Sequence, residues 1–538
     1  MKIASRVLQR ALGLDPPLTR DLMVQKDLRI PMSDGVELLA DRWAPRDGGE
    51  GLPTALIRSP YGRRGVLRSS FWLPLAERGY QVLVQSTRGT FGSGGDFDPM
   101  RQERDDGLAT LDWLIMQPWF GGSVVLAGAS YLGYTQWAVA DELPVEVKAM
   151  IPHVTESALT LEFLRSDGMS LETPFGWGVQ VDGQERRFAM LRALLGMRKT
   201  QRAQWTLPLS RADVAATGHR IGYVQDILAH DADSSRWATL DHSQRVIHTR
   251  APVSSIAGWH DIFLPGQLRD FCALQEVRDD CRLTVGPWTH SSLDGTAIRE
   301  VTEFGLAHAR GEHPAARAPV RLFVMGADVW RDFETWPPAG YASKRIHLRP
   351  GGVLAAEPLD QAPPATYRYD PADPTPAVGG VRLGGGGGRV DNTKVEARTD
   401  VLTYTTDELA AQVEIIGEVS AEIWFQSSRP CADVFVRLCD VDVRGRSYNV
   451  CDGLVTVQDA DELRCATVHL WPTAYQFKPG HRIRIQVSSG AFPRFARNAG
   501  TGAPRESDTT LRPAYQAIYH DAAHPSAVVL PARVSPRR

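Results

Sequence analysis

Two periods of hydrophobicity alternate along the first third of the chain. Short apolar runs rich in β-branched residues have the character of buried strands, and the stretches between them carry apolar residues at helical spacing. Strands and helices that alternate in this way indicate a parallel sheet with helices packed against it. In chain order, the segments are a strand at 53–59, a helix at 71–78, a strand at 81–85, a helix at 104–116 and a strand at 123–127.

Residues 27–45 come before this pattern and have one of their own. Two apolar runs flank the polar turn Ser33-Asp34-Gly35, which is typical of a hairpin. We therefore expect two antiparallel strands at the edge of the sheet.

The strand-and-helix pattern is interrupted in the middle of the chain. Helical spacing marks 156–165, 185–199 and 223–228, between strand-like runs at 147–152 and 252–257, and a further strand-like run follows at 282–285. Helices inserted between two strands of a sheet predict a cap above it. We expect residues 1–155 and 246–315 to form the sheet domain and residues 156–245 to form a helical cap domain.

Short alternating runs replace this pattern from about residue 316 onward. Runs at 413–425, 434–438 and 482–487 are separated by Gly, Pro and Asp clusters. Such spacing is typical of an all-β sandwich or jelly roll, which we predict for residues 316–538. We interpret Gly384–Gly388 as a mobile loop within it, because the Lys-Ser/Thr pair of a phosphate-binding loop does not follow.

Length and charge narrow the functional classes. A chain of 538 residues needs more than one hydrophobic core, since single cores stop growing near ~250–300 residues. The 60 Lys and Arg residues nearly balance 63 Asp and Glu, giving a net charge of -3 and no broad positive field, so we expect no nucleic-acid partner. No run approaches the ~20 apolar residues of a membrane-spanning helix, so we expect no membrane partner either.

The amino-terminal segment and the cysteines both favour a cytoplasmic location. Arg6 and Arg10 interrupt the apolar run that an export signal requires, so residues 1–14 are predicted as a surface helix. The six cysteines contain no C-x-x-C pair and are expected as buried thiols. If the protein is exported, a bridge stays open for four of them, namely Cys431, Cys439, Cys451 and Cys465.

One serine stands where an apolar strand runs into a helix of small residues. Residues 124–133 contain the pattern G-x-S-x-x-G with Ser130 at its centre. A nucleophilic serine at a sharp strand-to-helix turn needs small neighbours, and Gly128 and Ala129 meet that need. Gly133 lies one place later than in the pattern G-x-S-x-G. The alternative is that Ser130 only caps the following helix.

Two later residues complete a hydrolytic triad in the chain order Ser, Asp, His. Hydrolases whose serine lies at a strand-to-helix turn use this order. Asp261 and His290 each follow a strand-like run, as an acid and a base at the carboxyl edge of a sheet would. His260 competes as the base, but it precedes the acid. We predict that His290 takes the Ser130 proton during attack on an ester or amide carbonyl while Asp261 stabilises the imidazolium.

The oxyanion of such a reaction needs hydrogen-bond donors. The backbone N–H of Tyr131, directly after the nucleophile, is one. The loop at 58–62, after an early strand, offers Tyr61 and its phenol as a second, although this tyrosine could equally be a packing residue. No cofactor and no metal are expected, because H-E-x-x-H and nucleotide motifs are absent and Asp440 with Asp442 lacks the rest of a calcium loop.

With these motifs in place, the chain resembles the cocaine esterase and nonactate hydrolase family, which is related to α-amino acid ester hydrolases and X-Pro dipeptidyl peptidases. The resemblance implies Ser130, Asp261 and His290 as the triad, Tyr61 and Tyr131 as the oxyanion hole, a helical cap and a carboxy-terminal jelly roll. It spans nearly the whole chain and is carried by residues 30–36, 59–61, 106–119, 128–133, 258–261, 286–290, 324–326, 336–338 and 479–483.

The family pattern is G-x-S-Y-x-G, so the position of Gly133 agrees with it. Two positions depart from the pattern: Ser86 stands where an aspartate is expected, and Gly94 occupies a place often held by glutamate. The resemblance therefore leaves the salt bridges near these residues open.

The substrate class is less determined than the reaction. Family members act on esters, β-lactam acyl groups or proline dipeptides, and we expect a small-molecule ester first and an amide second. A peptidase or amino-ester hydrolase would need a carboxylate for the substrate ammonium, and Asp167, Glu172 and Asp182 are candidates with surface solvation as their alternative role. We predict an apolar acyl pocket lined by Trp137, Trp177, Trp259 and Trp288. The alternative is that these tryptophans pack in the hydrophobic core.

Two further alternatives stay open. The first is that the protein is a catalytically inert carbohydrate-binding or scaffold protein that acts through its carboxy-terminal domain. The intact triad argues against this alternative. A homo-oligomer fits the sequence as well as a monomer does.

Overall fold

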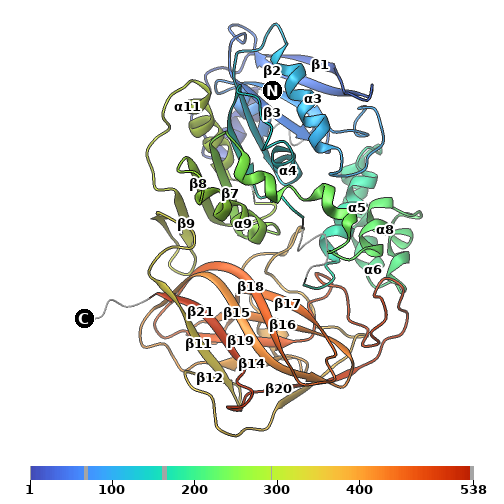
Figure 1. The fold of residues 1–538 in the computed structure, drawn as a ribbon, viewed down its shortest axis with the longest axis vertical. Coiled ribbons are helices and arrows are strands. Elements are labelled where there is room, and N and C mark those ends of the chain that lie inside the picture. Colours follow the sequence, from blue (N-terminus) through green and yellow to red (C-terminus); the bar gives the residue numbers. More distant parts are fainter. Residues whose placement is uncertain (1, 66–70, 160–166, 293, 534–538) are drawn as a thin grey trace.

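The computed structural model describes residues 2–65, 71–159, 167–292 and 294–533. Figure 1 shows three parts: a sheet flanked by helices, a group of helices to one side of it, and an all-β part that contains most of the last third of the chain.

The first part is a mixed sheet of ten strands in the order β1-β2-β4-β3-β5-β6-β7-β8-β9-β10. The strands from β4 to β9 in this order run parallel, and β1, β2 and β10 pair antiparallel at the two edges. Its strands are β1 (Leu22–Pro31), β2 (Glu37–Pro45), β3 (Thr54–Ser59), β4 (Gln81–Ser86), β5 (Val124–Ala129), β6 (Val147–His153), β7 (Val253–His260), β8 (Cys281–Thr289), β9 (Val320–Val324) and β10 (Val329–Phe333).

The predicted strands and helices of this sheet are confirmed, including the antiparallel edge expected at 27–45. The central strands β3, β4 and β5 are buried along nearly their whole length, which explains why they read as continuous apolar runs. The helices of this part are α1 (Lys2–Ala11), α2 (Leu73–Ala76), α3 (Glu103–Ile115), α4 (Tyr131–Trp137), α9 (Leu264–Gln275), α10 (Thr296–Glu300) and α11 (Leu306–Ala309).

The first sheet extends past the domain boundary that the sequence predicts at residue 316. Strand β9 pairs with β8 in parallel, and β10 pairs with β9, so both belong to the first sheet by hydrogen bonding. From Trp330 to Phe333, the side chains of β10 are alternately exposed and half-buried, as in an antiparallel strand at an edge. This alternation matches that of a β-sandwich strand. The prediction that the sandwich begins at residue 316 is therefore wrong for both β9 and β10.

The inserted segment forms helices. They are α5 (Glu172–Gly183), α6 (Ala189–Ala203), α7 (Ala212–Thr217) and α8 (Gly222–Ala229). Helices α6 and α8 overlap the runs expected at 185–199 and 223–228, whereas α5 and α7 lie outside the expected runs. The helix expected at 156–165 does not begin where predicted, because residues 156–159 are not helical and Ala158 forms a β-bridge with Asp241. The rest of that run, 160–165, lies outside the described part of the chain. Backbone hydrogen bonds join the start of α5 to the carboxy-terminal part: Leu171 N–H donates to the Arg494 carbonyl over 2.8 Å.

The carboxy-terminal part is all-β apart from the single turn α12 (Thr393–Glu396), within the described residues. Its strands pair mainly antiparallel, with β15 at the centre of the arrangement in contact with β18, β20 and β21. They are β11 (Tyr341–Arg349), β12 (Val353–Ala355), β13 (Ala365–Tyr369), β14 (Leu402–Thr405), β15 (Val413–Ser427), β16 (Cys431–Val441), β17 (Ser447–Gln458), β18 (Arg464–Phe477), β19 (Arg482–Ser488), β20 (Ala514–Tyr519) and β21 (Ala527–Arg533).

The glycine-rich segment 384–388 is closed at its base. Gly380 and Gly388 exchange two backbone hydrogen bonds of 2.8 and 2.7 Å, and Asn449 donates its amide to the Gly388 carbonyl. The segment that the sequence predicts as a mobile loop is thus the tip of a hairpin, residues 380–388, whose two ends are joined by hydrogen bonds. Leu383 lies in this hairpin.

All six cysteines carry free thiols. Within the ranges that the structure describes, no helix combines the length and the apolar character needed to cross a bilayer.

Candidate active site

Ser130 occupies the sharp turn between β5 and α4. Its backbone has φ 57° and ψ -126°, a conformation that residues other than glycine rarely adopt. The Ser130 N–H donates to the carbonyl of His153 over 2.8 Å, and the Ser130 carbonyl accepts from Gly133 and Tyr134. The surrounding backbone therefore holds a strained serine in place, as functional turns often do.

Two glycines around the serine are required by close packing. A Cβ atom on Gly128 would lie 2.4 Å from the Leu132 Cβ, and one on Gly133 would lie 2.4 Å from the Thr155 Cγ2. Gly133 is thus needed where α4 passes the segment that follows β6. This contact gives a physical reason for the spacing G-x-S-x-x-G.

Ser130, His290 and Asp261 form one hydrogen-bonded chain. The Ser130 Oγ lies 3.0 Å from the His290 Nε2, and the His290 Nδ1 lies 2.7 Å from the Asp261 Oδ2. The Asp261 side chain is fully buried, and its other oxygen accepts the backbone N–H of Phe263 over 2.8 Å. The carboxylate fixes the orientation of the imidazole, whose second nitrogen faces the serine.

The acid and the base follow the ends of neighbouring strands, β7 and β8, as expected. His260, the competing base, is the last residue of β7 and is buried. Burial lowers the pKa of His260 to about 4, so this ring is neutral at ordinary pH. His290 is therefore the histidine that the structure brings to Ser130.

The Tyr61 phenol lies beside the serine. Burial raises its pKa to about 12, while hydrogen bonds with Trp177 and Ser130 oppose that rise. The Trp177 indole N–H donates to the phenol oxygen over 2.9 Å. At neutral pH, Tyr61 is therefore a protonated phenol with its own hydrogen available to donate.

Tyr131 contributes to the site in a different way. Its hydroxyl donates to the Glu103 Oε1 over 2.7 Å and accepts the Met100 N–H over 2.7 Å. The hydroxyl therefore stabilises the structure around the site. Glu103 in turn forms a buried ion pair with Arg58 at 2.9 Å. The Tyr131 backbone N–H is the first of α4, and the first N–H groups of a helix have no intrahelical acceptor.

A pocket of about 330 Å³, including its open mouth, lies in front of the nucleophile. Aromatic and aliphatic side chains form most of its wall. They come from the sheet part, from the start of the inserted segment, from α5 and from the hairpin of the carboxy-terminal part: Tyr61, Met100, Ser130, Tyr131, Tyr134, Thr155, Leu159, Trp177, Ile262, Phe263 and Leu383.

Of the four tryptophans predicted for the pocket, only Trp177 is among the described lining residues, and the prediction is wrong for the other three. Trp137 is buried within the core on α4. Trp259 donates its indole N–H to the Phe323 carbonyl and packs against Trp336. Trp288 packs against Trp330 and covers Gly286. All three pack within or beside the sheet instead of facing the nucleophile.

The prediction missed several wall residues. Ile262 and Phe263 directly follow the acid, and Phe263 packs edge-on against the His290 ring, with centroids 5.4 Å apart. Their place after Asp261 was a usable signal. Leu383 gave no signal of its own, because only the fold brings the hairpin to the pocket.

The three carboxylates considered for a substrate ammonium lie outside the pocket wall. Glu172 forms an ion pair with Arg382, with one contact at 2.8 Å. Asp182 is held by His219 and Arg186. Asp167 is an exposed residue near His469, and partial desolvation of its carboxyl raises the pKa of that group. Among the described lining residues, none carries a carboxylate.

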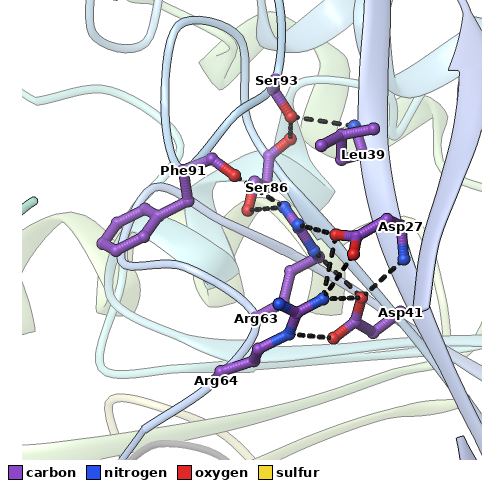
Figure 2. A network of polar contacts seen from close by, with 8 residues as sticks. All are labelled: Asp27, Leu39, Asp41, Arg63, Arg64, Ser86, Phe91 and Ser93. Atoms are coloured by element: carbon purple, nitrogen blue, oxygen red, sulfur yellow. Dashed lines mark hydrogen bonds and ion pairs between the residues drawn. The ribbon is translucent and has the colours of Figure 1, made fainter.

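A charge network with the buried pair Arg63 and Asp41 at its centre, and the half-exposed Asp27 and Arg64 at its rim, supports the loop that carries Tyr61. Figure 2 shows the guanidinium groups of Arg63 and Arg64 converging on Asp27 and Asp41. Arg63 lies 2.7 Å from Asp27 and 3.2 Å from Asp41, and it also donates to the Ser86 Oγ over 2.7 Å. Ser86 therefore acts as a neutral acceptor, and the two aspartates supply the charge that was expected at its position.

Gly94, the other departure, packs tightly against the edge hairpin. Its N–H donates to the Glu37 carbonyl over 2.8 Å, and a Cβ atom there would lie 3.2 Å from that oxygen and from Val36. A larger residue would have to displace this turn. The nearby Arg88 finds its charge partners in Asp106 and Asp34 instead.

Comparison with known proteins places this site in a family. The X-Pro dipeptidyl-peptidase (S15 family) model matches residues 34–292, and the X-Pro dipeptidyl-peptidase C-terminal non-catalytic domain matches residues 313–529. A cocaine esterase from Rhodococcus sp. (strain MB1 Bresler) is 34% identical over 94% of this chain and 98% of its own.

Solved structures share the fold across the whole length. An aminopeptidase from the marine sediment archaeon Thaumarchaeota archaeon matches with a TM-score of 0.82, at 21% identity over 97% of this chain and 98% of its own. An α-amino acid ester hydrolase matches with a TM-score of 0.81, at 21% identity and the same coverage. The chain belongs to the family of serine ester hydrolases that includes cocaine esterase and that is built from the two X-Pro dipeptidyl-peptidase domains.

Proposed function

We propose that the protein hydrolyses carboxylic esters with an apolar acyl group, through an acyl-enzyme on Ser130. The hydrogen-bonded chain from Ser130 through His290 to Asp261 is the observation that carries this proposal. An arrangement of nucleophile, base and buried acid at these distances performs acyl transfer on several unrelated folds.

Each step follows from the positions of the groups. The Ser130 Oγ adds to the carbonyl carbon while its proton passes to the His290 Nε2, and the negative charge develops on the carbonyl oxygen. The Tyr61 hydroxyl and the Tyr131 N–H are the donors for that oxygen. When the ester bond breaks, His290 returns the proton to the leaving alcohol. Water then attacks the acyl group by the same route, which releases the acid and restores Ser130.

The pocket wall favours a neutral, apolar acyl group. Tyr134, Trp177 and Phe263 offer aromatic surface, and Leu159 and Leu383 offer aliphatic surface. An X-Pro dipeptidyl peptidase or an amino-ester hydrolase must bind a substrate ammonium, and an unpaired carboxylate is the usual partner for such a charge. The described wall supplies no carboxylate, so simple esters rank ahead of both alternatives.

The proposal is tested by turnover of p-nitrophenyl acetate and butyrate by the wild type and by Ser130→Ala, with the folding of both verified by circular dichroism. We expect turnover by the wild type alone. Equal rates for the two folded proteins would remove Ser130 from the reaction and favour the inert binding protein. Cleavage of Xaa-Pro chromogenic amides in place of the esters would favour the peptidase.

Two finer assignments of the fold belong to this proposal. We class the first part as an α/β-hydrolase domain, because Ser130, Asp261 and His290 follow β5, β7 and β8 at one edge of a mainly parallel sheet. We class the carboxy-terminal part as a jelly roll, on its long antiparallel strands. An experimental structure without two packed sheets in that part would contradict the second assignment.

For location and assembly we propose a cytoplasmic protein that is free to form a homo-oligomer. Six free thiols suit a reducing compartment. Cell fractionation tests the first point, and sedimentation of the purified protein tests the second.

A further inference from the structure

The Tyr61 phenol has a second partner that the mechanism above does not use. The Trp177 indole N–H donates to its oxygen over 2.9 Å from the other side of the pocket. Trp177 is only 5% exposed, and its ring stacks on Tyr131 with an interplanar angle of 16°. It also meets the ring of Tyr223 edge-on, with centroids 4.8 Å apart. Rings on two sides therefore restrict how the indole can turn.

This hydrogen bond limits the directions that the phenol hydrogen can take. A phenol oxygen has one hydrogen to donate and lone pairs with which it accepts. When the indole N–H occupies a lone pair, the hydroxyl hydrogen must be directed away from Trp177, and the phenol's other hydrogen-bond partner in the pocket is Ser130. A donor held in this direction before the reaction stabilises a developing oxyanion without reorganising.

Helix α5, which carries Trp177, is fixed at both ends. At its start, Glu172 pairs with Arg382 of the carboxy-terminal hairpin. At its end, the Gln184 side chain donates to the Pro60 carbonyl over 2.9 Å, directly before Tyr61. The helix therefore holds the tyrosine loop at two points, through Gln184 on the backbone and through Trp177 on the phenol.

We propose that Trp177 is a positioning residue that aims the Tyr61 hydroxyl at the oxyanion, in addition to being part of the pocket wall. This inference rests on the proposed function, since it assigns the phenol to the oxyanion. It predicts that the effect of losing the indole N–H depends on the presence of the Tyr61 hydroxyl.

The experiment is a double-mutant cycle with Trp177→Phe, Tyr61→Phe and the double variant. Phenylalanine keeps a ring in the wall and removes only the donor and part of the bulk. In the Tyr61 background, we expect Trp177→Phe to lower kcat for p-nitrophenyl butyrate about tenfold, with KM changed by less than about threefold. In the Tyr61→Phe background, we expect it to change kcat by less than about twofold.

Trp237→Phe is the matched control. Trp237 is a buried cap tryptophan whose indole N–H donates to the Asp231 carbonyl over 2.8 Å, and it is not among the pocket residues. We expect its kcat to stay near that of the wild type. Circular dichroism and thermal melting verify that every variant folds.

Three results would overturn the positioning role. They are an equal loss of kcat in both backgrounds, a loss confined to KM, and a loss below about twofold in the Tyr61 background. Each would leave Trp177 as a wall residue in an active esterase, so the proposed function would survive.

If the wild type turns over no ester, the proposed function fails, and the cycle is read from the rate of fluorophosphonate labelling. The same dependence of the Trp177→Phe effect on Tyr61 would then support the positioning role. Folded wild-type protein that is not labelled at all would overturn the positioning role and the proposed function together.

Discussion

The triad and the pocket wall are built in different ways. Ser130, Asp261 and His290 follow strands of one sheet, and each lies at a turn that the neighbouring backbone fixes. The wall combines residues from three parts of the molecule, with Trp177 on a cap helix and Leu383 on a hairpin of the carboxy-terminal part.

This difference separates reaction chemistry from substrate selection. The sheet supplies the groups that move protons, and it is buried and continuous. The residues that shape the pocket depend on how the cap and the hairpin dock on the sheet. Changes to the triad should therefore affect every ester alike, whereas changes to the wall should affect some esters more than others.

The largest effect is expected from the acid of the triad. Asp261→Asn keeps the size of the side chain but favours the wrong imidazole tautomer, so we expect kcat for p-nitrophenyl esters to fall about 10⁴-fold. The fall in kcat should be the same for the acetate and the butyrate ester. Asp332→Asn, which alters a half-exposed ion pair on β10, is the control and should leave kcat unchanged. A loss below tenfold for Asp261→Asn would contradict the assigned role.

Tyr61→Phe is expected to have the next largest effect. Removing one oxyanion donor lowers kcat by about 10²- to 10³-fold. Because burial raises the pKa of Tyr61 to about 12, the phenol stays protonated well beyond neutral pH. The wild type should therefore show no fall in kcat between about pH 9 and 10 from ionisation of this group. An alkaline fall that disappears in Tyr61→Phe would show a lower pKa than the structure predicts.

The charge network of Asp27, Asp41, Arg63 and Arg64 should contribute to the free energy of unfolding. Arg63 is 5% exposed and Asp41 is fully buried, so Arg63→Met leaves buried negative charge with less compensation. We expect the free energy of unfolding to fall by about 3 kcal/mol, measured by urea denaturation. Arg29→Met removes an exposed pair with Glu37 and should cost less than about 1 kcal/mol. Equal losses for the two variants would show that burial of the network contributes nothing.

The smallest expected effect is a change in the preference between two ester substrates. Leu383→Trp narrows the pocket without touching the triad, so the ratio of kcat/KM for butyrate to that for acetate should fall about tenfold. Leu359→Trp, at an exposed site of the same part, is the control. A ratio that changes by less than twofold would place Leu383 outside the acyl path.

The same contrast explains what could be predicted from the sequence. The triad could be located because an apolar strand followed by a polar residue is a local pattern, and β5, β7 and β8 each show it. Among the tryptophans, Trp177 and Trp137 both stand in apolar helical surroundings, and only tertiary packing decides which one faces the nucleophile. Local patterns carry no information on such docking.

The boundary between the sheets shows a second limit. Strand β10 alternates like a strand of an antiparallel sandwich, because it is the exposed antiparallel edge of a mainly parallel sheet. Periodicity reports exposure of the two faces of a strand, and it does not report which sheet the strand joins.

The central claim is that Ser130 is the activated nucleophile, and covalent labelling tests it most directly. Folded wild-type protein and Ser130→Ala are each treated with a fluorophosphonate, and the modified peptide is identified by mass spectrometry. The account predicts one phosphonyl group, attached to Ser130 in the wild type, and no label in the variant. Labelling of another residue, or equal labelling of both proteins, would contradict it.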